Sequence, residues 1–249
     1  MTQEARPFRF PFIQFVLLLT ALAITCTVLY YRAPSPALST DSTPASTPLL
    51  TFSRVVLDAG HGGEDGGTQS ATEVLEKDLN LHMAMLLADL FAMQGTEVIL
   101  TREDDRLLYD PTSDYQGHKK EQDLAARLKI ATSVQDALFI SIHMNAFPQT
   151  QYRGLQVWYS PNHESSLPLA QAMQATVRTY LQPQNARRVK PATSSIFLLH
   201  HLNTPALLVE CGFLSNPEEA NLLATPEYRQ QLALLIFLST FSCEGAYAK

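Results

Sequence analysis

Two patterns of apolar and polar positions alternate along the chain from residue 51 onward. In the first, apolar residues recur three or four positions apart, which is typical of helices that bury one face. This pattern covers residues 78–93, 122–134, 166–181 and 226–241. In the second, short apolar runs lie between polar or glycine-rich segments, which is typical of buried strands. This pattern covers residues 54–58, 96–101, 137–142, 154–159, 196–199 and 206–209.

The alternation of the two patterns predicts the fold class. Strands that alternate with helices form mostly parallel sheets that are covered by helices on both faces. We therefore predict a single α/β domain over residues 51–249, with a mostly parallel, roughly six-stranded sheet flanked by helices on both faces.

A longer apolar stretch, residues 12–31, carries no charge and has Gln14 as its only strongly polar member. A helix of this length spans roughly 30 Å, which matches the hydrocarbon core of a bilayer. Arg6 and Arg9 precede it, and the positive-inside bias then predicts that residues 1–11 are cytoplasmic and the rest extracytoplasmic. We predict an uncleaved transmembrane signal-anchor over residues 12–31. A cleaved secretory signal is the alternative.

The next segment, residues 32–50, is rich in Pro, Ser, Thr and Ala. Such a composition cannot bury a core and is typical of a partly extended linker. The chain is therefore predicted to consist of an anchor, a linker and the domain of residues 51–249.

Charge and cysteine content narrow the possible partners. The net charge of −6 argues against nucleic acid or an anionic membrane surface as a partner bound through bulk electrostatics. The three cysteines, Cys26, Cys211 and Cys243, are too few for a disulfide framework, and their spacing fits no structural zinc module. Because Cys26 lies in the apolar stretch, only Cys211 and Cys243 could pair within the domain. Two unpaired thiols are the alternative.

Candidate catalytic residues follow the predicted strands. His61 comes after the first strand, His143 directly follows residues 137–142, and Glu210 ends the run 206–209. In open α/β sheets, ligands bind at the carboxyl ends of the strands, so these side chains are expected to converge. Glu76 precedes the helix that starts near residue 78 and can reach the same edge.

These four residues match the needs of a hydrolytic zinc site. Two histidines and a carboxylate can hold the ion and leave a position open for water. A second carboxylate can then move the proton of that water. A histidine after a strand is also often a hydrogen-bonded structural residue, so the residues alone leave both readings open.

Several motifs occur in a telling order: VVLDAGHGGEDGG (55–67), EKDLNL (76–81), TR (101–102), FISIHMNA (139–146) and LLVECGFLSN (207–216). Together they resemble the zinc-dependent N-acetylmuramoyl-L-alanine amidases of the amidase-3 family, from Arg54 to the C-terminal helix. The resemblance implies one Zn²⁺ per chain, bound by His61, Glu76 and His143, with Glu210 as the catalytic residue.

The resemblance also implies the substrate. It is peptidoglycan, cut at the amide between the lactoyl group of N-acetylmuramic acid and L-alanine of the stem peptide. Asp58 and Asn145 are candidates for orienting the ligands, and Arg102 and Arg127 are candidates for binding a stem-peptide carboxylate. For each of these four, a structural role is the alternative. Thr132, Cys211 and the long polar loop 107–121 depart from the commoner family pattern.

The remaining candidates are weaker. We predict that His82 packs within a helix and that His118 and His163 lie in polar loops. His200 and His201 form a pair near the end of a predicted short strand, from which one of them could approach the substrate. These positions are read from the strand and helix patterns alone. Cys211 is adjacent to Glu210, but no histidine and asparagine partners are evident for a cysteine nucleophile.

The plan of anchor, linker and catalytic domain resembles the germination-specific members of the family in endospore-forming bacteria. It implies a role in spore-cortex maturation, in which peptide removal precedes muramic-lactam formation. The domain would then act in the cell envelope, including the intermembrane space of the forespore, and no activating protein partner is identified. The alternatives are an amidase for daughter-cell separation or wall turnover, and a catalytically inactive wall-binding scaffold.

Overall fold

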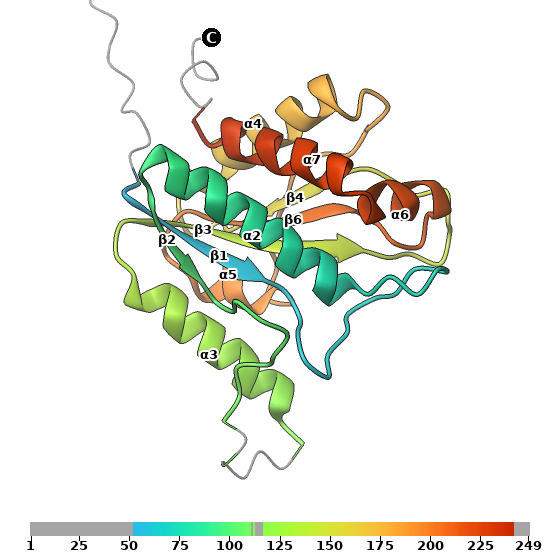
Figure 1. Ribbon diagram of the computed structural model, residues 1–249. Coiled ribbons are helices and arrows are strands. Elements are labelled where there is room, and N and C mark those ends of the chain that lie inside the picture. The colour runs from blue at the N-terminus through green and yellow to red at the C-terminus, as the bar shows by residue number, and fades with distance from the viewer. Residues whose placement is uncertain (1–51, 111, 113–116, 242–249) are drawn as a thin grey trace, which may run out of the picture. The chain divides into compact units, whose positions relative to one another are not determined.

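A computed structural model describes residues 52–110, 112 and 117–241, which form a central sheet covered by helices (Figure 1). The six-stranded sheet has the order β2-β1-β3-β6-β4-β5. Its strands are β1 (Arg54–Ala59), β2 (Glu97–Leu100), β3 (Ala137–Asn145), β4 (Gln156–Tyr159), β5 (Lys190–Pro191) and β6 (Ala206–Phe213). All neighbouring pairs are parallel except β4 and β6. The predicted single α/β domain with a mostly parallel sheet is confirmed.

Helices cover both faces of the sheet (Figure 1). One face packs against α2 (Glu76–Gln94), α4 (Ser166–Tyr180), α6 (Pro217–Ala224) and α7 (Pro226–Ser239), and the other packs against α3 (Lys119–Ser133) and α5 (Phe197–His201). Side chains of β1 alternate between the two cores. Val55 and Leu57 join the first, while Val56 joins the second. This period of two is expected for a strand buried on both faces.

Three elements differ from the prediction. Residues 196–199 were predicted as a strand, but Phe197–His201 form helix α5, because a short apolar run fits a buried strand and a buried helix equally well. The sixth strand is instead the two-residue β5. Helix α6 was not predicted, although Pro217 begins it and the Asn216 side chain accepts a hydrogen bond from the Glu219 backbone N–H.

Strand register brings the ends of β1, β3 and β6 together on the α3 and α5 side. Asp58 pairs with Ser141, and His143 pairs with Glu210. Because paired residues on adjacent strands point to the same face, His143 and Glu210 are neighbours. A register shift follows, after which Asn145 pairs with Phe213.

Some sequence-based expectations lie outside the described residues. These are the anchor at 12–31, the linker at 32–50, Cys26 and Cys243. Cys211 is a buried free thiol. Of the helices in the described part of the chain, none combines the length and the apolarity needed to cross a membrane.

Candidate active site

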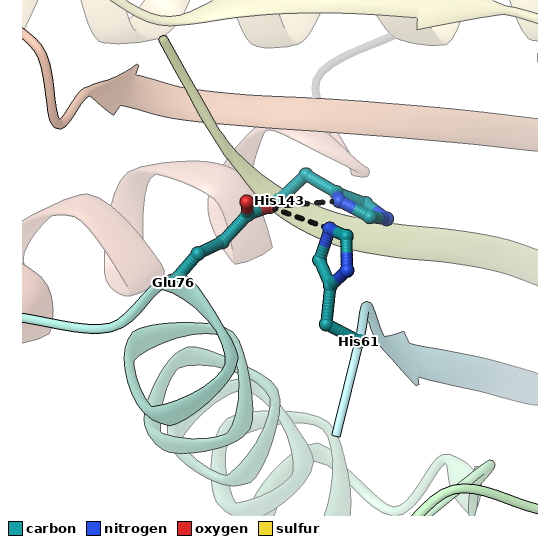
Figure 2. A group of neighbouring side chains, drawn as sticks. All are labelled: His61, Glu76 and His143. Atoms are coloured by element: carbon teal, nitrogen blue, oxygen red, sulfur yellow. Dashed lines mark hydrogen bonds and ion pairs between the residues drawn. The ribbon is translucent and has the colours of Figure 1, made fainter. Parts of the chain in front are cut away.

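Three potential ligands meet at the carboxyl ends of β1 and β3 (Figure 2). His61 follows β1, Glu76 is the first residue of α2, and His143 lies near the end of β3. Glu76 Oε1 is 3.0 Å from His143 Nδ1 and 3.3 Å from His61 Nε2. One ligand atom from each residue lies within 4.8 Å of the others. We call these three residues the ligand cluster.

The ligand cluster fits a zinc ion. Ligand atoms bound tetrahedrally at about 2.0–2.1 Å lie roughly 3.3 Å apart, close to the two separations from Glu76. Two imidazole nitrogens and a carboxylate are also the donor types that hydrolytic zinc sites use. Nearby, Glu210 Oε2 is buried without a hydrogen-bond partner among the described residues. Such atoms are uncommon in native proteins and are typical of sites that await a ligand.

Hydrogen bonds fix the carboxylate of Glu76 between the two rings. Its Oε2 accepts the backbone N–H of Thr68 at 2.8 Å, and its Oε1 accepts the backbone N–H of Met144 at 3.1 Å and the side-chain amide of Asn80 at 3.3 Å. Burial alone would raise the pKa of Glu76, but hydrogen bonds with His143 and His61 hold it well below its ordinary value. The carboxylate is therefore charged, as a metal ligand must be.

Two glycines make room for these side chains. A Cβ atom on Gly60 would lie 2.3 Å from His143 Nε2, and one on Gly67 would lie 2.5 Å from Glu76 Oε2. Gly67 also has a φ of +68°, which favours glycine. His61 itself has a φ of 61°, an uncommon conformation for a residue with a side chain. The side chains of His143 and Glu76 therefore require glycine at positions 60 and 67.

Asp65 is a neighbour of the ligand cluster that sequence reasoning missed. Its Oδ2 lies 2.9 Å from His61 Nδ1, although the contact is not aligned as a hydrogen bond. Reciprocal backbone hydrogen bonds between Gly62 and Asp65 close a tight turn that brings it back. Burial lowers the pKa of His61, but Glu76 and Asp65 together raise it above its ordinary value. In the sequence, the glycine-rich turn was the only indication that the chain reverses here and brings Asp65 next to His61.

Glu210 lies beside the ligand cluster on β6. It is the register partner of His143, and its Oε2 is one of three buried side-chain polar atoms without a hydrogen-bond partner among the described residues. Burial raises the pKa of Glu210 to about 7. This carboxyl therefore changes protonation near neutral pH, as a group that exchanges protons with a substrate must.

A cavity of about 250 Å³ opens onto these residues between the sheet, α3 and α5. Its floor includes His61, His143 and Glu210, and its walls include Leu124 of α3 and Phe197 of α5. It offers space for a substrate next to the candidate catalytic groups.

Two buried arginines lie behind the loop that carries His61. Arg102 donates to the carbonyl oxygens of Ala59 at 2.9 Å, Gly60 at 3.0 Å and Lys77 at 2.8 Å. Arg127 donates to the carbonyl oxygens of Ala59 and His61, both at 2.7 Å. Their side chains therefore hold the backbone of the loop in place.

Carboxylates balance the charge of Arg127. It forms ion pairs of 2.7 Å with Asp58 and with Asp123. Asp58 also accepts hydrogen bonds from Thr101 at 2.8 Å and Ser141 at 2.6 Å. Burial alone would raise the pKa of Asp58, but the charge of Arg127 and these hydrogen bonds hold it below its ordinary value. We call Asp58, Arg102, Asp123 and Arg127 the arginine cluster.

The other candidates are more scattered. The backbone carbonyl of Asn145 accepts the N–H of Leu214 at 2.8 Å. This bond does not involve the Asn145 side chain, whose ligand-orienting role stays a prediction. His82 is exposed on α2, His118 is 2.8 Å from Glu121, and the ring of His163 accepts the N–H of Ser165. His200 and His201 are exposed on α5 rather than on a strand. Burial raises the pKa of the Cys211 thiol, which disfavours a thiolate nucleophile.

Comparisons with known proteins identify the family of the chain. The profile of the N-acetylmuramoyl-L-alanine amidase family, amidase-3, matches residues 55–239. The germination-specific N-acetylmuramoyl-L-alanine amidase of Bacillus subtilis is 36% identical over 194 residues, which are 78% of this chain and 80% of that protein. The probable cell wall amidase LytH of Staphylococcus aureus is 30% identical over 197 residues, 77% of this chain and 58% of LytH.

A solved structure is also similar. It is the CwlD amidase of Clostridioides difficile, in complex with the GerS lipoprotein. The sequence identity is 37% and the TM-score is 0.70, and the match covers 75% of this chain and 95% of that one.

Proposed function

The chain belongs to the N-acetylmuramoyl-L-alanine amidase family, and we propose that it works with one zinc ion held by His61, Glu76 and His143. As a member of this family, it is an N-acetylmuramoyl-L-alanine amidase that acts on peptidoglycan. The bond that it hydrolyses joins the lactoyl group of N-acetylmuramic acid to L-alanine of the stem peptide. The observation that carries the zinc proposal is the convergence of two imidazoles on one buried, charged carboxylate.

Glu210 is the general base in this proposal. When bound, zinc lowers the pKa of a water molecule towards neutrality and polarises the carbonyl under attack. Glu210 accepts the proton of the attacking water and gives it to the amine of L-alanine as the C–N bond breaks. Two observations support this role: Oε2 has no other hydrogen-bond partner in the described residues, and a pKa of about 7 lets the carboxyl both accept and release a proton.

The arginine cluster supports the reaction indirectly in this proposal. Arg102 and Arg127 hold the carbonyls of residues 59–61, and this segment places the His61 ring against Glu76. Because these guanidinium groups are buried and already bonded, their task is to fix the loop. A donor set held in advance loses less conformational freedom when a metal binds.

The substitution Glu210→Gln tests the mechanism. In the zinc-loaded protein, we expect about one zinc per chain to remain and the rate of amide cleavage to fall about 10²- to 10⁴-fold, because the proton carrier is lost. Zinc content and the release of muramic acid from its peptides are the two measurements. Glu218→Gln is the matched control, since Glu218 is exposed and lies on α6. Full activity in Glu210→Gln would refute the role of Glu210 as general base. Wild-type protein that holds no zinc and cleaves no amide would refute the mechanism and favour an inactive wall-binding scaffold.

We further propose that the amidase acts in spore-cortex maturation, upstream of muramic-lactam formation. The similarity to a germination-specific amidase and to CwlD supports this assignment. The deletion strain would then build a cortex that lacks muramic-lactam, which digestion and chromatography of the cortex would reveal. Normal muramic-lactam content would exclude the cortex role.

The similarity to LytH favours a second candidate role in turnover of the vegetative wall or in daughter-cell separation. A deletion strain would then show a normal cortex, together with chained cells or a vegetative wall whose peptide substitution is altered. Microscopy of growing cells, beside the cortex digest, separates the two roles.

The proposed location is the extracytoplasmic side of the membrane. This proposal rests on the apolar residues 12–31 and on Arg6 and Arg9 before them. Fractionation of cells and sequencing of the N-terminus of the mature protein would test it. A chain that retains residues 1–11 in the membrane fraction fits an anchor, and a shortened chain in the external fraction fits a cleaved signal.

A further inference from the structure

Arg187 lies in the loop between α4 and β5, outside both clusters. Its guanidinium carbon is 4.1 Å from the centre of the Phe213 ring and 5.7 Å from that of Tyr152. Its Nε donates to the carbonyl oxygen of Arg153 at 2.9 Å, and its Nη1 donates to Gln156 Oε1 at 3.1 Å. Nη2 makes no hydrogen bond with the residues that the structure describes. The group is thus held over an aromatic ring and still has N–H donors without a partner among the described residues.

Strand register places Arg187 next to the reaction centre. Gln156, which Arg187 contacts, is the register partner of Glu210 across β4 and β6. Because of the register shift in β6, Phe213 pairs with Asn145 just as Glu210 pairs with His143. Phe213 therefore lies on the same face as Glu210, one step nearer the carboxyl end of the sheet. Arg187 packs on Phe213 and bonds to Gln156, so it lies beside the Glu210 carboxylate on the side of β4.

Two exposed aromatic rings extend this border. Phe147 and Tyr152 meet edge to face, with ring centres 5.0 Å apart. Their exposed fractions are 48% and 42%, although large aromatic side chains usually gain stability from burial. A cation and an exposed pair of rings thus stand together on the β4 side of Glu210. Such a surface suits a ligand that carries both a carboxylate and aliphatic groups.

The cavity on the opposite side has the reverse charge. Its charged lining consists of four carboxylates, Asp58, Asp65, Asp123 and Glu210, against two cations, Lys120 and Arg127. Arg127 is already paired with Asp58 and Asp123. An anionic group is therefore disfavoured in the cavity and favoured at Arg187. The substrate has the same asymmetry, because sugar hydroxyls lie on the acyl side of the cut bond and carboxylates lie on the peptide side.

We propose that Arg187, with Tyr152 and Phe147, forms a subsite that binds the carboxylate of the second residue of the stem peptide. The peptide then lies over the end of β4, and the sugar side of the cut bond faces the cavity. The task that the sequence suggested for Arg102 and Arg127 falls to an arginine with free donors at the surface. This inference rests on the proposed amidase reaction and specifies how its substrate is oriented.

A pair of substrates isolates the carboxylate. Two soluble muramoyl peptides would differ only at the second residue, which is D-glutamate in one and its α-amide, D-isoglutamine, in the other. The kcat and KM of the zinc-loaded full chain are measured for both. We expect the wild-type protein to have the lower KM for the carboxylate substrate, by about ten-fold or more, because a charged hydrogen bond is lost in the amide.

Variants of Arg187 and of its neighbour Arg188 then show which arginine causes the preference for the carboxylate substrate. We expect Arg187→Gln to raise KM for the carboxylate substrate to that of the amide, with kcat on the amide substrate retained. Arg187→Lys should restore part of the preference, since it keeps the charge but not the planar pair of donors. Arg188→Gln is the control, because Arg188 is exposed and contacts Gln156 only through its backbone carbonyl.

Each outcome has a distinct meaning. Equal KM values for the two substrates in the wild-type protein, with normal turnover, would overturn the subsite and leave the amidase function intact, even if Arg187→Gln fails to fold. A loss in Arg187→Gln that is the same for both substrates would show a merely structural role and would also overturn the subsite. Failure of the wild-type protein to cleave either peptide would overturn the proposed reaction together with this inference.

Discussion

The arginine cluster and the ligand cluster meet at the short loop of residues 59–61, yet they differ in how fully their polar atoms are hydrogen-bonded. In the arginine cluster, Asp58 has three side-chain partners, and Arg127 donates to two carboxylates and two carbonyls. Beside the ligand cluster, Glu210 Oε2 is buried without a hydrogen bond, and His61 Nδ1 has only the 2.9 Å ion pair with Asp65.

This difference separates stability from function within a few residues. A buried charge whose partners are all present holds its surroundings rigidly, and removing one partner is costly. A buried polar atom without a partner lowers stability but stays available to a ligand or a substrate. The loop of residues 59–61 joins the two, so the satisfied cluster holds the unsatisfied one in position. Substitutions in the ligand cluster should therefore lower mainly activity, and substitutions in the arginine cluster should lower mainly the free energy of unfolding.

Removing a ligand should have the largest effect, and it should fall on activity. We expect His143→Ala to lose its zinc and at least about a thousand-fold of its amidase rate, because water activation requires the ion. The metal-free protein should lose less stability than a variant of the arginine cluster, because the buried Glu76 keeps its hydrogen bonds from Thr68, Asn80 and Met144. Zinc analysis, the rate assay and calorimetry measure the three quantities. His82→Ala is the control, because His82 is exposed on α2. Retention of zinc and rate in His143→Ala would refute this ligand assignment.

Removing a member of the arginine cluster should instead fall on folding. Arg127→Ala leaves Asp58 and Asp123 buried without their cation, so we expect the free energy of unfolding to fall by about 3–5 kcal/mol. Arg54→Ala is the matched control. Arg54 forms a 2.9 Å pair with Glu97 at the surface, and its loss should cost no more than about 1 kcal/mol. Denaturant unfolding measures both, and equal losses would contradict the distinction between the clusters.

The unsatisfied carboxylate next to the ligands should itself lower stability. Its raised pKa, about 7 against an ordinary 4.5, means that the folded state binds the Glu210 proton more tightly than the unfolded state. Unfolding free energy must therefore fall as pH rises between these two values. Glu210→Gln carries no such proton. We expect the metal-free variant to gain on the order of 2–3 kcal/mol over the wild type between pH 4.5 and pH 8.

Unfolding curves of metal-free wild-type protein and Glu210→Gln at several pH values check this expectation. Other titrating groups change in both proteins, so the difference between the curves isolates residue 210. A difference that stays constant with pH would show that the carboxyl of Glu210 has an ordinary pKa. Glu218→Gln again serves as the control, since its exposed side chain should give a difference near zero.

The sequence predicted the ligand cluster better than its surroundings, for a physical reason. The positions of His61, His143 and Glu210 follow from strand ends and parallel pairing, which hydrophobic patterns reveal. The partners of a long side chain do not follow from such patterns. Arg102 and Arg127 stand near the loop in any parallel sheet, but only the folded backbone decides that they meet carbonyl groups rather than substrate. Arg187, in a loop after α4, gave no pattern at all.

The same limit explains two other differences. Asp65 reaches His61 only because the turn at Gly62 reverses the chain, and turn geometry is weakly encoded in residue types. Helix α5 and a short strand look alike in the run of residues 196–199, because four apolar residues do not define a period. The long pattern of α2, by contrast, was predicted within two residues at its start and one at its end.

Asp65 stands at the border between the two clusters and allows a finer test of how they cooperate. Its carboxylate lies 2.9 Å from His61 Nδ1, the ring atom opposite the one that faces Glu76. A carboxylate in this place fixes the ring of a metal-bound histidine and raises its basicity, and its loss typically weakens metal binding 10- to 100-fold. We therefore expect Asp65→Asn to weaken zinc binding by about that factor, in competition with a chelator, while Asp89→Asn on the exposed face of α2 has no effect.

Unchanged affinity in Asp65→Asn would mean that the backbone alone orients His61, through its φ of 61° and the hydrogen bond from Arg127 to its carbonyl. The arginine cluster would then carry the whole positioning task, and Arg127→Lys, which keeps the charge but loses the fork of donors, should weaken zinc binding more than Asp65→Asn does.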